Sequence, residues 1–385
     1  MNRTTYDAIV IGAGSVGVPA ALALAGQGLS VLVLDEHPSP GQGNNKKAIG
    51  GIRATHSDFG KIRVCQRSIE LFARWEEEHG DDIGWLSNGY SFPAYSEADE
   101  RKLKELMRVQ HEFGLDIRWL AADEYAELAP GISREGLRGS TYSPGDGSAS
   151  PLLAMGAFYF RSRDRGAVYR FGETVTGITT AAGRVTGVVT DRGAYGCGSL
   201  VNAAGNNARA VAELAGESFP VRPDSHEAAI TEPVARFFGP MIVDMRAGEN
   251  SLNYYFYQNR EGQVVFCITP HPPIWGEDNA STSVFFPQVA RRMVSLYPRL
   301  ANLKVRRAWR GQYPMTPDAF PIVGRTRSCP NFIQAIGMCG QGFMLGPGLG
   351  ELLARLVTDA LTEEDARILQ SFDPYRAFTG TEAFQ

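Results

Sequence analysis

The segment Ala8-Ile-Val-Ile-Gly12-Ala-Gly14-Ser-Val-Gly17 decides the fold of this chain. A short apolar strand pattern ends at Ile11, and three glycines with the spacing G-x-G-x-x-G lead from it into a helical pattern. A second apolar strand pattern, Ser30 to Leu34, ends in Asp35. A strand, a glycine turn, a helix, a strand and an acidic residue in this order predict a β-α-β unit that binds a dinucleotide.

Each residue type in this unit has a physical task. Gly12 permits the tight turn out of the strand, Gly14 lets backbone amides approach a pyrophosphate, and Gly17 lets the helix lie close to the sheet. The helix N-terminus offers N–H groups and a positive dipole to the phosphates. Asp35 follows Gly17 by eighteen residues, where a carboxylate can accept hydrogen bonds from ribose hydroxyls. A glycine turn without a ligand is the alternative, and the complete order of elements argues against it.

The rest of the chain favours FAD over NAD as this dinucleotide. The unit starts the chain, and no second G-x-G-x-x-G follows it for a nicotinamide. The same absence argues against a flavoprotein hydroxylase, which needs a site for a nicotinamide cofactor.

Length and composition indicate an ordinary globular protein of two interlocked domains. The chain has 385 residues, 43% of them hydrophobic and 21% charged. A net charge of −4 gives no electrostatic footprint for nucleic acid or an anionic membrane. Glycines interrupt the apolar stretch from Ala8 to Leu34, so we expect no transmembrane segment and no signal peptide. The five cysteines form no C-x-x-C pair, which predicts reduced thiols, no metal site and a cytoplasmic location.

A polar, glycine-rich segment from Gly41 to Arg53 follows the second strand. We expect it to run along the cofactor, where Asn44, Asn45, Lys46 and Lys47 would offer donors to phosphate. A solvated surface loop is the alternative. Helical apolar spacing then predicts helices over residues 61–78 and 99–113.

The second half alternates between strand-rich and glycine-rich stretches. Strand patterns occupy residues 166–190 and 199–205, and aromatic and β-branched residues from 219 to 310 predict an antiparallel sheet of a second domain. A strand over 331–336 leads into glycine-rich residues 337–348, and a helix is predicted from Gly350 to Leu361. The glycine-rich turn would aim N–H groups at the flavin N1–C2=O locus, or its glycines serve packing alone.

Six stretches together resemble the D-amino-acid oxidase, glycine oxidase and sarcosine oxidase family. Within that family the chain is most similar to the β-subunits of heteromeric sarcosine oxidase and of dye-linked L-proline dehydrogenase. The resemblance runs nearly end to end and rests on Gly12 to Asp35, Gly50-Gly-Ile-Arg53, Arg67-Ser-Ile-Glu-Leu-Phe, Val201-Asn-Ala-Ala-Gly205, Thr316-Pro-Asp-Ala-Phe-Pro-Ile-Val-Gly324 and Gly340-Gln-Gly-Phe-Met.

The resemblance implies an α/β fold with a Rossmann-like FAD-binding domain of the glutathione reductase type and an α+β second domain. The expected FAD-binding domain is discontinuous and comprises residues 1–90, 145–215 and 320–385. The expected substrate-binding domain comprises residues 91–144 and 216–319, and its antiparallel sheet roofs the flavin.

The chemistry implied by the resemblance is oxidation of a C–N bond by hydride transfer to flavin N5. The expected substrate is a small secondary amino acid such as proline, hydroxyproline, sarcosine or an opine, and the role would lie in amino-acid catabolism. The chain would be the catalytic β-subunit of a heteromeric complex. The alternatives are a stand-alone oxidase that uses O₂ and releases H₂O₂, and a flavin-binding electron-transfer or scaffold subunit without catalysis.

The resemblance assigns catalytic positions to Arg53, Tyr313 and Met344. Arg53 aligns with an arginine that holds the substrate carboxylate, and a structural salt bridge is the alternative role. Tyr313 stands where glycine oxidase-like members carry a carboxylate-binding arginine, and Met344 stands where sarcosine oxidases carry a second carboxylate-binding lysine. His56 would lie near the pocket or serve the core. We expect Tyr254, Tyr255, Phe256 and Trp309 to shape the substrate pocket.

The chain departs from the family pattern at three further positions. Gly311 replaces the cysteine that attaches FAD in monomeric sarcosine oxidases, so we expect non-covalent FAD. Cys267 replaces the lysine that activates O₂, which makes a fast reaction with O₂ doubtful. Ser150 lies near the histidine that attaches FMN in heteromeric sarcosine oxidases, so any FMN at a subunit interface would also be non-covalent. The predicted cofactor-binding residues are, in full, Gly12, Gly14, Ser15, Val16, Gly17, Asp35, Glu36, Asn44, Asn45, Lys46, Lys47, Val175, Ala203, Ala204, Gly205, Gly311, Gly340, Gln341, Gly342, Phe343 and Met344.

Overall fold

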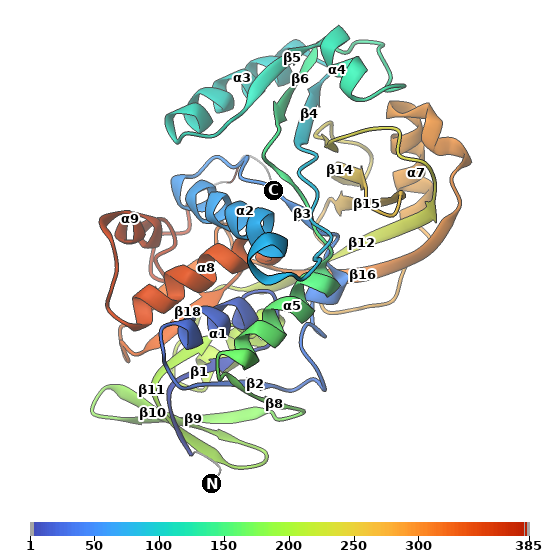
Figure 1. Cartoon of the computed structure of the whole chain (residues 1–385). Helices are drawn as coiled ribbons and strands as arrows, with labels where there is room; N and C mark the ends of the chain where they lie inside the picture. The colour runs from blue at the N-terminus through green and yellow to red at the C-terminus, as the bar shows by residue number, and fades with distance from the viewer. Residues whose placement is uncertain (1–3, 381, 383–385) are drawn as a thin grey trace.

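The protein is built around two eight-stranded sheets (Figure 1). The computed structural model describes residues 4–380 and 382. The first sheet has the order β17-β18-β11-β1-β2-β8, with β10 paired to β11 and β9 paired to β10. Its strands are β1 (Thr5–Ile11), β2 (Val31–Asp35), β8 (Val168–Phe171), β9 (Val175–Ala181), β10 (Arg184–Thr190), β11 (Ala194–Asn202), β17 (Ile322–Arg325) and β18 (Phe332–Ile336).

The central strands of the first sheet are parallel and covered on both faces. Such strands have continuous apolar runs, as β1 and β2 do. On one face Ala8 and Val10 belong to a hydrophobic core that also contains residues of four helices: α1 (Gly17–Gly26), α2 (Phe59–His79), α5 (Pro151–Asp164) and α8 (Gly342–Val357). On the other face Ile9 and Ile11 pack against β10 and α6 (Ala208–Glu213).

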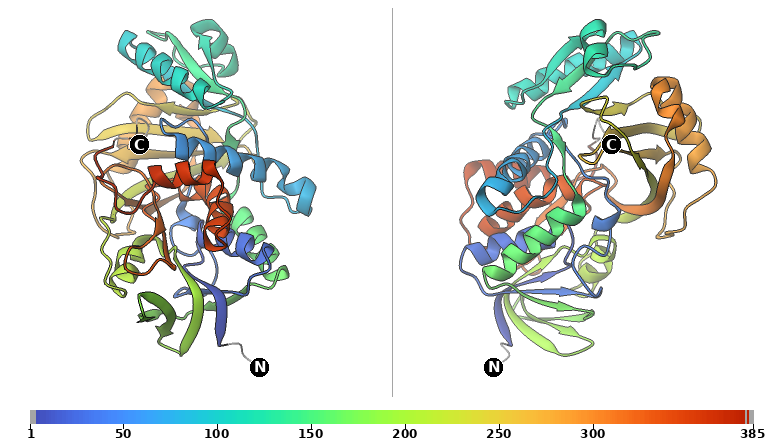
Figure 2. Two further views of the ribbon diagram at one scale, coloured as in Figure 1. Left: turned by 90° about the vertical axis from the view of Figure 1, so that its left-hand side faces the viewer. Right: turned by 45° about the vertical axis from the view of Figure 1, so that its right-hand side comes forward.

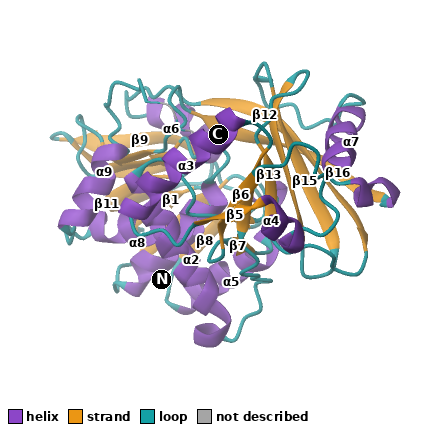
Figure 3. Ribbon diagram, turned by 90° about the horizontal axis from the view of Figure 1, so that it is seen from above, coloured by secondary structure: helices purple, strands orange, loops and turns teal. Residues whose placement is uncertain are grey.

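The second sheet has the order β16-β12-β15-β14-β13-β4-β6-β5, and its pairs are antiparallel except β13 with β4. Its strands are β4 (Tyr90–Ala94), β5 (Arg118–Ala121), β6 (Gly139–Ser143), β12 (Arg222–Pro233), β13 (Met241–Asp244), β14 (Ser251–Gln258), β15 (Gln263–Pro270) and β16 (Val305–Met315). Helix α7 (Phe285–Leu296) covers the outer face of this sheet, and Figure 3 shows it on the far side of β15 and β16 from the helices of the first sheet.

Shorter elements connect these layers. They are β3 (Gly51–Ile52), β7 (Gly147–Ser148), α3 (Glu97–Glu112), α4 (Ala122–Leu128), α9 (Glu363–Ser371) and the 3₁₀ turns η1 (Asn45–Lys47), η2 (Gly205–Asn207) and η3 (Pro298–Asn302). The two views in Figure 2 place α3 and α4 at the end of the molecule opposite the N-terminus.

The predicted fold class is confirmed, because the molecule combines a parallel α/β layer with a largely antiparallel second sheet. The helices predicted over 61–78 and 99–113 correspond to α2 and α3. The domain boundaries remain a proposal. They agree with the origin of the strands, since the first sheet draws on residues 5–35, 168–202 and 322–336 and the second on 90–143 and 222–315.

The helix predicted from Gly350 to Leu361 is wrong at both ends, because α8 spans Gly342–Val357 and contains Pro347. Gly346 and Gly348 suggested a turn, yet they lie on the packing face of the helix. A Cβ on Gly346 would lie 1.9 Å from the Ser15 carbonyl oxygen, and one on Gly348 would lie 2.3 Å from that of Val64. These glycines let α8 contact the backbones of α1 and α2 directly.

No helix in residues 4–380 is long and apolar enough to cross a membrane. All five cysteines are buried and unpaired.

Candidate active site

A cavity of about 1100 Å³ lies at the carboxyl edge of the parallel strands. Gly12 follows β1, Glu36 follows β2, Ala203 follows β11 and Gly337 follows β18, and all four residues line it. Ligands of open α/β sheets bind at this edge, where successive turns diverge. The second sheet closes the cavity from above through β12, β14, β15 and β16.

The glycine turn has the geometry expected of a phosphate cradle. Gly12 has φ +105°, and a Cβ there would lie 2.4 Å from the Ala203 carbonyl oxygen. A Cβ on Gly17 would lie 1.8 Å from the Gly12 carbonyl oxygen, which confines position 17 to glycine. Gly14 lines the cavity, and among the residues that the structure describes no atom lies within 4 Å of its Cβ position and no side chain caps the start of α1. The turn therefore leaves backbone amides and space for an anionic group.

Two acidic residues at the end of β2, Asp35 and Glu36, line the cavity, and Asp35 also holds the glycine turn. Asp35 accepts hydrogen bonds from the Ala13 amide at 2.6 Å and from the His37 amide at 2.8 Å. Glu36 accepts from Asn207 Nδ2 at 2.7 Å. Both carboxylates line the cavity, and a carboxylate oxygen can accept more than one hydrogen bond. Binding of ribose by Asp35 stays a prediction.

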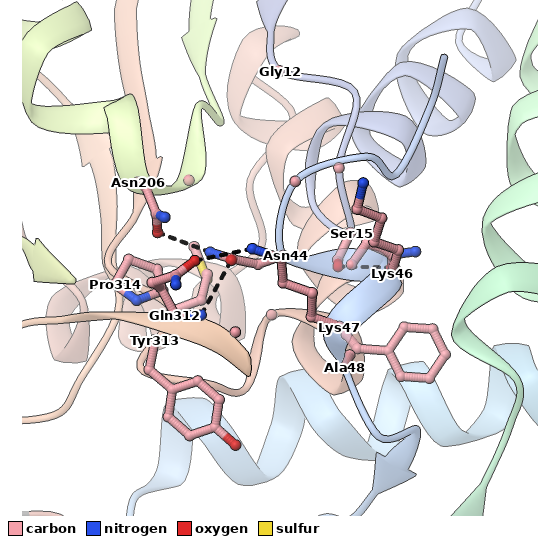
Figure 4. Close-up of a pocket in the computed structure, with 18 of the residues that line it drawn as sticks. Gly12, Ser15, Asn44, Lys46, Lys47, Ala48, Asn206, Gln312, Tyr313 and Pro314 are labelled. Carbon is pink, nitrogen blue, oxygen red and sulfur yellow. Dashed lines mark hydrogen bonds between the residues drawn. The ribbon is translucent and has the colours of Figure 1, made fainter. Parts of the chain in front are cut away.

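The segment after β2 lines the cavity, as expected, and its side chains mainly hold neighbouring segments together (Figure 4). Asn44 donates to Asn206 Oδ1 at 2.8 Å and accepts from the Gln312 amide at 3.3 Å. Asn45 is buried, accepts from Ser15 Oγ at 2.9 Å and donates to the Pro151 carbonyl at 2.9 Å. The side-chain amide groups of both asparagines therefore bond to other residues of the protein.

The two lysines of this segment lie in different surroundings. Lys46 donates to Gln42 Oε1 at 3.0 Å. Lys47 reaches Asn279 and donates to Gln312 Oε1 at 3.1 Å. Burial, with the nearby Lys46 charge, lowers the pKa of Lys47. Contact of either lysine with a phosphate stays a prediction.

Four side chains on the inner face of the second sheet roof the cavity: His226, Tyr255, Cys267 and Tyr313. The Tyr255 and Tyr313 hydroxyls lie 2.7 Å apart, and Cys267 lies beside both. Burial raises the pKa of both tyrosines well above the ordinary value and that of Cys267 to about 11. All three groups are therefore neutral at physiological pH.

His226 stacks on Tyr313 with ring centroids 3.9 Å apart. Its Nε2 lies 3.0 Å from Asp224 Oδ2, and its Nδ1 is buried with no partner among the residues that the structure describes. Neither Asp224 nor His226 was singled out in the sequence analysis. The available signal was D-x-H within a strand, because alternation places residues two apart on one face.

The structure separates the residues expected to shape the substrate pocket. Tyr255 and Trp309 line the cavity. Tyr254 and Phe256 alternate to the outer face and pack in the core beneath α7. Met344 and Tyr313 also line the cavity, and their catalytic role stays a prediction.

Arg53 is not among the cavity-lining residues. It is 8% exposed, donates to the Thr55 carbonyl and lies 3.3 Å from His56 Nδ1. Gly50 and Gly51, just before it, do line the cavity. Burial, then the charges of Arg53 and Lys61, holds the pKa of His56 well below its usual value. The carboxylate-binding role of Arg53 stays a prediction.

Nineteen of the predicted cofactor-binding residues line the cavity; the other two are Gly17 and Gln341. Gly17 is buried under the turn. Gln341 is the N-cap of α8, and its Oε1 is buried with no partner among the described residues. The uncapped α1 terminus, the open space at Gly14 and the volume of the cavity fit a dinucleotide as large as FAD.

The chain is similar to known proteins over most of its length. The family model "DAO: FAD dependent oxidoreductase" matches residues 7–356. Subunit HcnC of hydrogen cyanide synthase from Pseudomonas aeruginosa is 25% identical over 93% of each chain. The β subunit of sarcosine oxidase from Rhodobacter capsulatus is 25% identical over 92% of this chain and 85% of its own.

Among solved structures, L-proline dehydrogenase from P. horikoshii superposes with a TM-score of 0.90 at 29% identity, covering 97% of this chain and 98% of its own. Glycine oxidase from Geobacillus kaustophilus gives a TM-score of 0.86 at 22% identity, over 97% and 99%, and shows the fold. The family resemblance of the motifs is thereby confirmed: the chain belongs to the DAO family of FAD-dependent oxidoreductases, with FAD as its cofactor.

Proposed function

We propose that the protein oxidises the C–N bond of a small secondary amino acid of the proline, hydroxyproline, sarcosine or opine type. One observation carries this proposal. Neutral tyrosine hydroxyls share the roof of a cavity in an FAD-dependent oxidoreductase with a histidine nitrogen that has no partner within residues 4–380 and 382. Relatives named as a sarcosine oxidase subunit and an L-proline dehydrogenase support the substrate class.

The roof side chains offer what amine oxidation needs. An amino acid enters with an ammonium group, which must lose a proton before the adjacent C–H bond can give up a hydride. His226 Nδ1 is the nitrogen at the roof able to take that proton, if Nε2 carries the hydrogen toward Asp224. The Tyr255 and Tyr313 hydroxyls are donors to the carboxylate, and Arg53 remains the second proposed carboxylate partner.

FAD, when bound, supplies the hydride acceptor at its N5 atom. We propose that the glycine turn and the start of α1 hold its diphosphate, that Asp35 or Glu36 holds its ribose, and that residues 340–344 lie along its flavin. Position 311 is glycine, which has no side chain for a covalent link, so we propose non-covalent binding.

We further propose that the chain works as the catalytic subunit of a heteromeric complex in the cytoplasm. Exposed apolar side chains on helix α5 support the proposal of a partner subunit: Leu152, Leu153 and Phe160 are 63%, 50% and 60% exposed. Ser150, which lies near the position of the FMN-attaching histidine in heteromeric sarcosine oxidases, caps the same helix by accepting from the Leu153 amide.

The deciding experiment follows flavin absorbance of the purified chain under anaerobic conditions. L-proline, the hydroxyproline isomers, sarcosine and an opine are added in turn. Bleaching by one of them supports the proposal, and tetrahydro-2-furoate is the matched control because it keeps the proline ring and carboxylate without the amine. Re-oxidation in air then separates an oxidase from a dehydrogenase. A flavin that none of these amines bleaches, with or without a partner subunit, would contradict the proposed substrate class.

A further inference from the structure

Residues 271–284, here termed the strap, connect β15 to α7 and run across β12 and β16. The Ser225 amide donates to the Ile274 carbonyl at 2.8 Å, and the Gly276 amide donates to the Pro223 carbonyl at 3.0 Å. Farther along the strap, Glu227 accepts from the Thr282 amide at 2.7 Å. The strap thus extends the pairing of β12 beyond the end of β15.

One side chain joins the strap to the roof of the cavity. Asp224 is 5% exposed, and its Oδ1 accepts a hydrogen bond from the Ile274 amide at 2.7 Å. Its Oδ2 lies 3.0 Å from His226 Nε2. The backbone N–H of Ile274 can only donate and a carboxylate can only accept. The strap therefore fixes the position of the Asp224 carboxylate, and this carboxylate favours a proton on His226 Nε2.

The other nitrogen of His226 is then left with a lone pair. His226 lines the cavity, it is 6% exposed, and Nδ1 has no partner among the described residues. A buried polar atom without a partner costs free energy, which a ligand in the cavity can recover by bonding to it.

We infer that Asp224 is a positioning residue: held by the strap, it fixes the tautomer of His226 so that Nδ1 accepts the proton of the substrate ammonium. This inference rests on the proposed function for its substrate. The step is a proton transfer only, in which the substrate N–H bond breaks and an Nδ1–H bond forms. The resulting imidazolium is stabilised by the Asp224 carboxylate, and the neutral amine keeps its electron pair.

On its own strand, Asp224 is the charged residue that contacts the His226 ring, whereas Glu227 bonds to Thr282 of the strap. The titratable groups facing it from other elements are Tyr313 of β16, Tyr255 of β14 and Cys267 of β15, and the strap contributes Glu277 to the same cavity. Because burial raises the pKa of both tyrosines and of the cysteine, none of the three places a charge beside His226 at physiological pH.

The sharpest variant is Asp224→Asn. Its amide oxygen can keep the Ile274 hydrogen bond, while its NH₂ group turns toward His226 Nε2 and forces the ring proton onto Nδ1. The variant therefore keeps the strap in place and reverses the tautomer. Ser225→Ala is the matched control, because it removes the bond from Ser225 Oγ to the Gly276 carbonyl and leaves Asp224 untouched.

The first measurement reads the tautomer without any turnover. The chain has six histidines, so ¹⁵N-histidine labelling gives few signals, and His226→Gln identifies the relevant one. We expect the Nε2–H tautomer in the wild type and in Ser225→Ala, and the Nδ1–H tautomer in Asp224→Asn. An Nδ1-protonated ring in the wild type across pH 7–9, or an unchanged tautomer in Asp224→Asn, would overturn the inference.

The second measurement is the rate of anaerobic flavin reduction by L-proline and sarcosine as a function of pH. We expect Asp224→Asn to lose about 10²- to 10⁴-fold at pH 7 and to regain about tenfold per pH unit as the free amine forms in solution. Ser225→Ala should follow the wild-type profile. Equal rates in wild type and Asp224→Asn would overturn the positioning role. If neither amine bleaches the wild type, the proposed function fails, and the tautomer measurement alone decides the inference.

Discussion

The cradle at the glycine turn and the roof on the second sheet form one cavity by opposite means. In the cradle the functional groups are backbone amides and missing side chains, and they come from one short stretch, Gly12 to Gly17. In the roof they are side chains from four strands, with His226 and Tyr313 brought together across the sheet. A cradle made of backbone serves any protein that binds this cofactor, whereas a roof made of side chains can change its substrate one residue at a time.

The largest expected effect tests whether the cradle depends on backbone geometry. In Gly17→Ala the new Cβ would lie 1.8 Å from the Gly12 carbonyl oxygen, so the turn and α1 must move apart. We expect loss of bound FAD and a drop of several kcal/mol in the free energy of unfolding, measured by flavin content and denaturant titration.

Gly14→Ala is the matched control, because no atom of the described part of the chain lies within 4 Å of its Cβ position. We expect the apoprotein to keep its stability within about 0.5 kcal/mol while FAD affinity falls, since the methyl group occupies the cavity. Equal damage to the two apoproteins, or wild-type FAD affinity in Gly14→Ala, would contradict the assignment of the cradle.

A second prediction concerns the buried polar groups beside Arg53. Asp146 is 1% exposed, its Oδ1 accepts from the Ala54 amide at 2.9 Å, and burial raises its pKa to about 7. Because the folded pKa lies above the ordinary value of 3.8, the proton on Asp146 stabilises the folded state. This contribution to the free energy of unfolding is complete below pH 4 and is lost as the pH rises toward 7. At pH 8 the loss is on the order of 4 kcal/mol, at about 1.4 kcal/mol per tenfold change in proton affinity.

Asp146→Asn removes this titration and keeps an oxygen for the Ala54 amide. We expect wild-type unfolding free energy to fall between pH 5 and pH 8 and that of the variant to stay nearly level. Denaturant titrations at both pH values check this. Parallel pH dependence in the two proteins would mean that Asp146 is already ionised at pH 5.

The smallest effect concerns the tyrosine pair of the roof. Tyr255→Phe and Tyr313→Phe each remove a neutral hydroxyl proposed to donate to a substrate carboxylate, a bond worth about 1.5–3 kcal/mol. We expect kcat/KM for the amine identified by bleaching to fall about 10- to 100-fold. Tyr254→Phe is the matched control, because its hydroxyl donates to the Arg292 carbonyl on the outer face. If kcat/KM is unchanged in both roof variants and KM is raised in Arg53→Lys, binding of the substrate carboxylate would be assigned to Arg53 and not to the tyrosines.

The same contrast explains what the sequence could predict. The β-α-β unit is local, so its strands, its glycines and its place in the cavity follow from spacing alone. The start of α8 could not be predicted, because Gly346 and Gly348 indicate a turn until the backbones of α1 and α2 are known to lie against them. The D-x-H pattern places Asp224 and His226 on one face of a strand, but their position at the cavity depends on the pairing of β12 with β16 and on the strap, and no local pattern contains these two.

Asn44 has a consequence for how the protein is made. It bonds to Asn206 and to Gln312, which lie 162 and 268 residues farther along the chain, and cavity-lining residues continue to Met344. During synthesis the complete binding surface cannot exist until nearly the whole chain has left the ribosome. Cofactor capture by the complete surface is therefore a late event in the folding of each molecule, after the segments around residues 44, 206 and 312 have met.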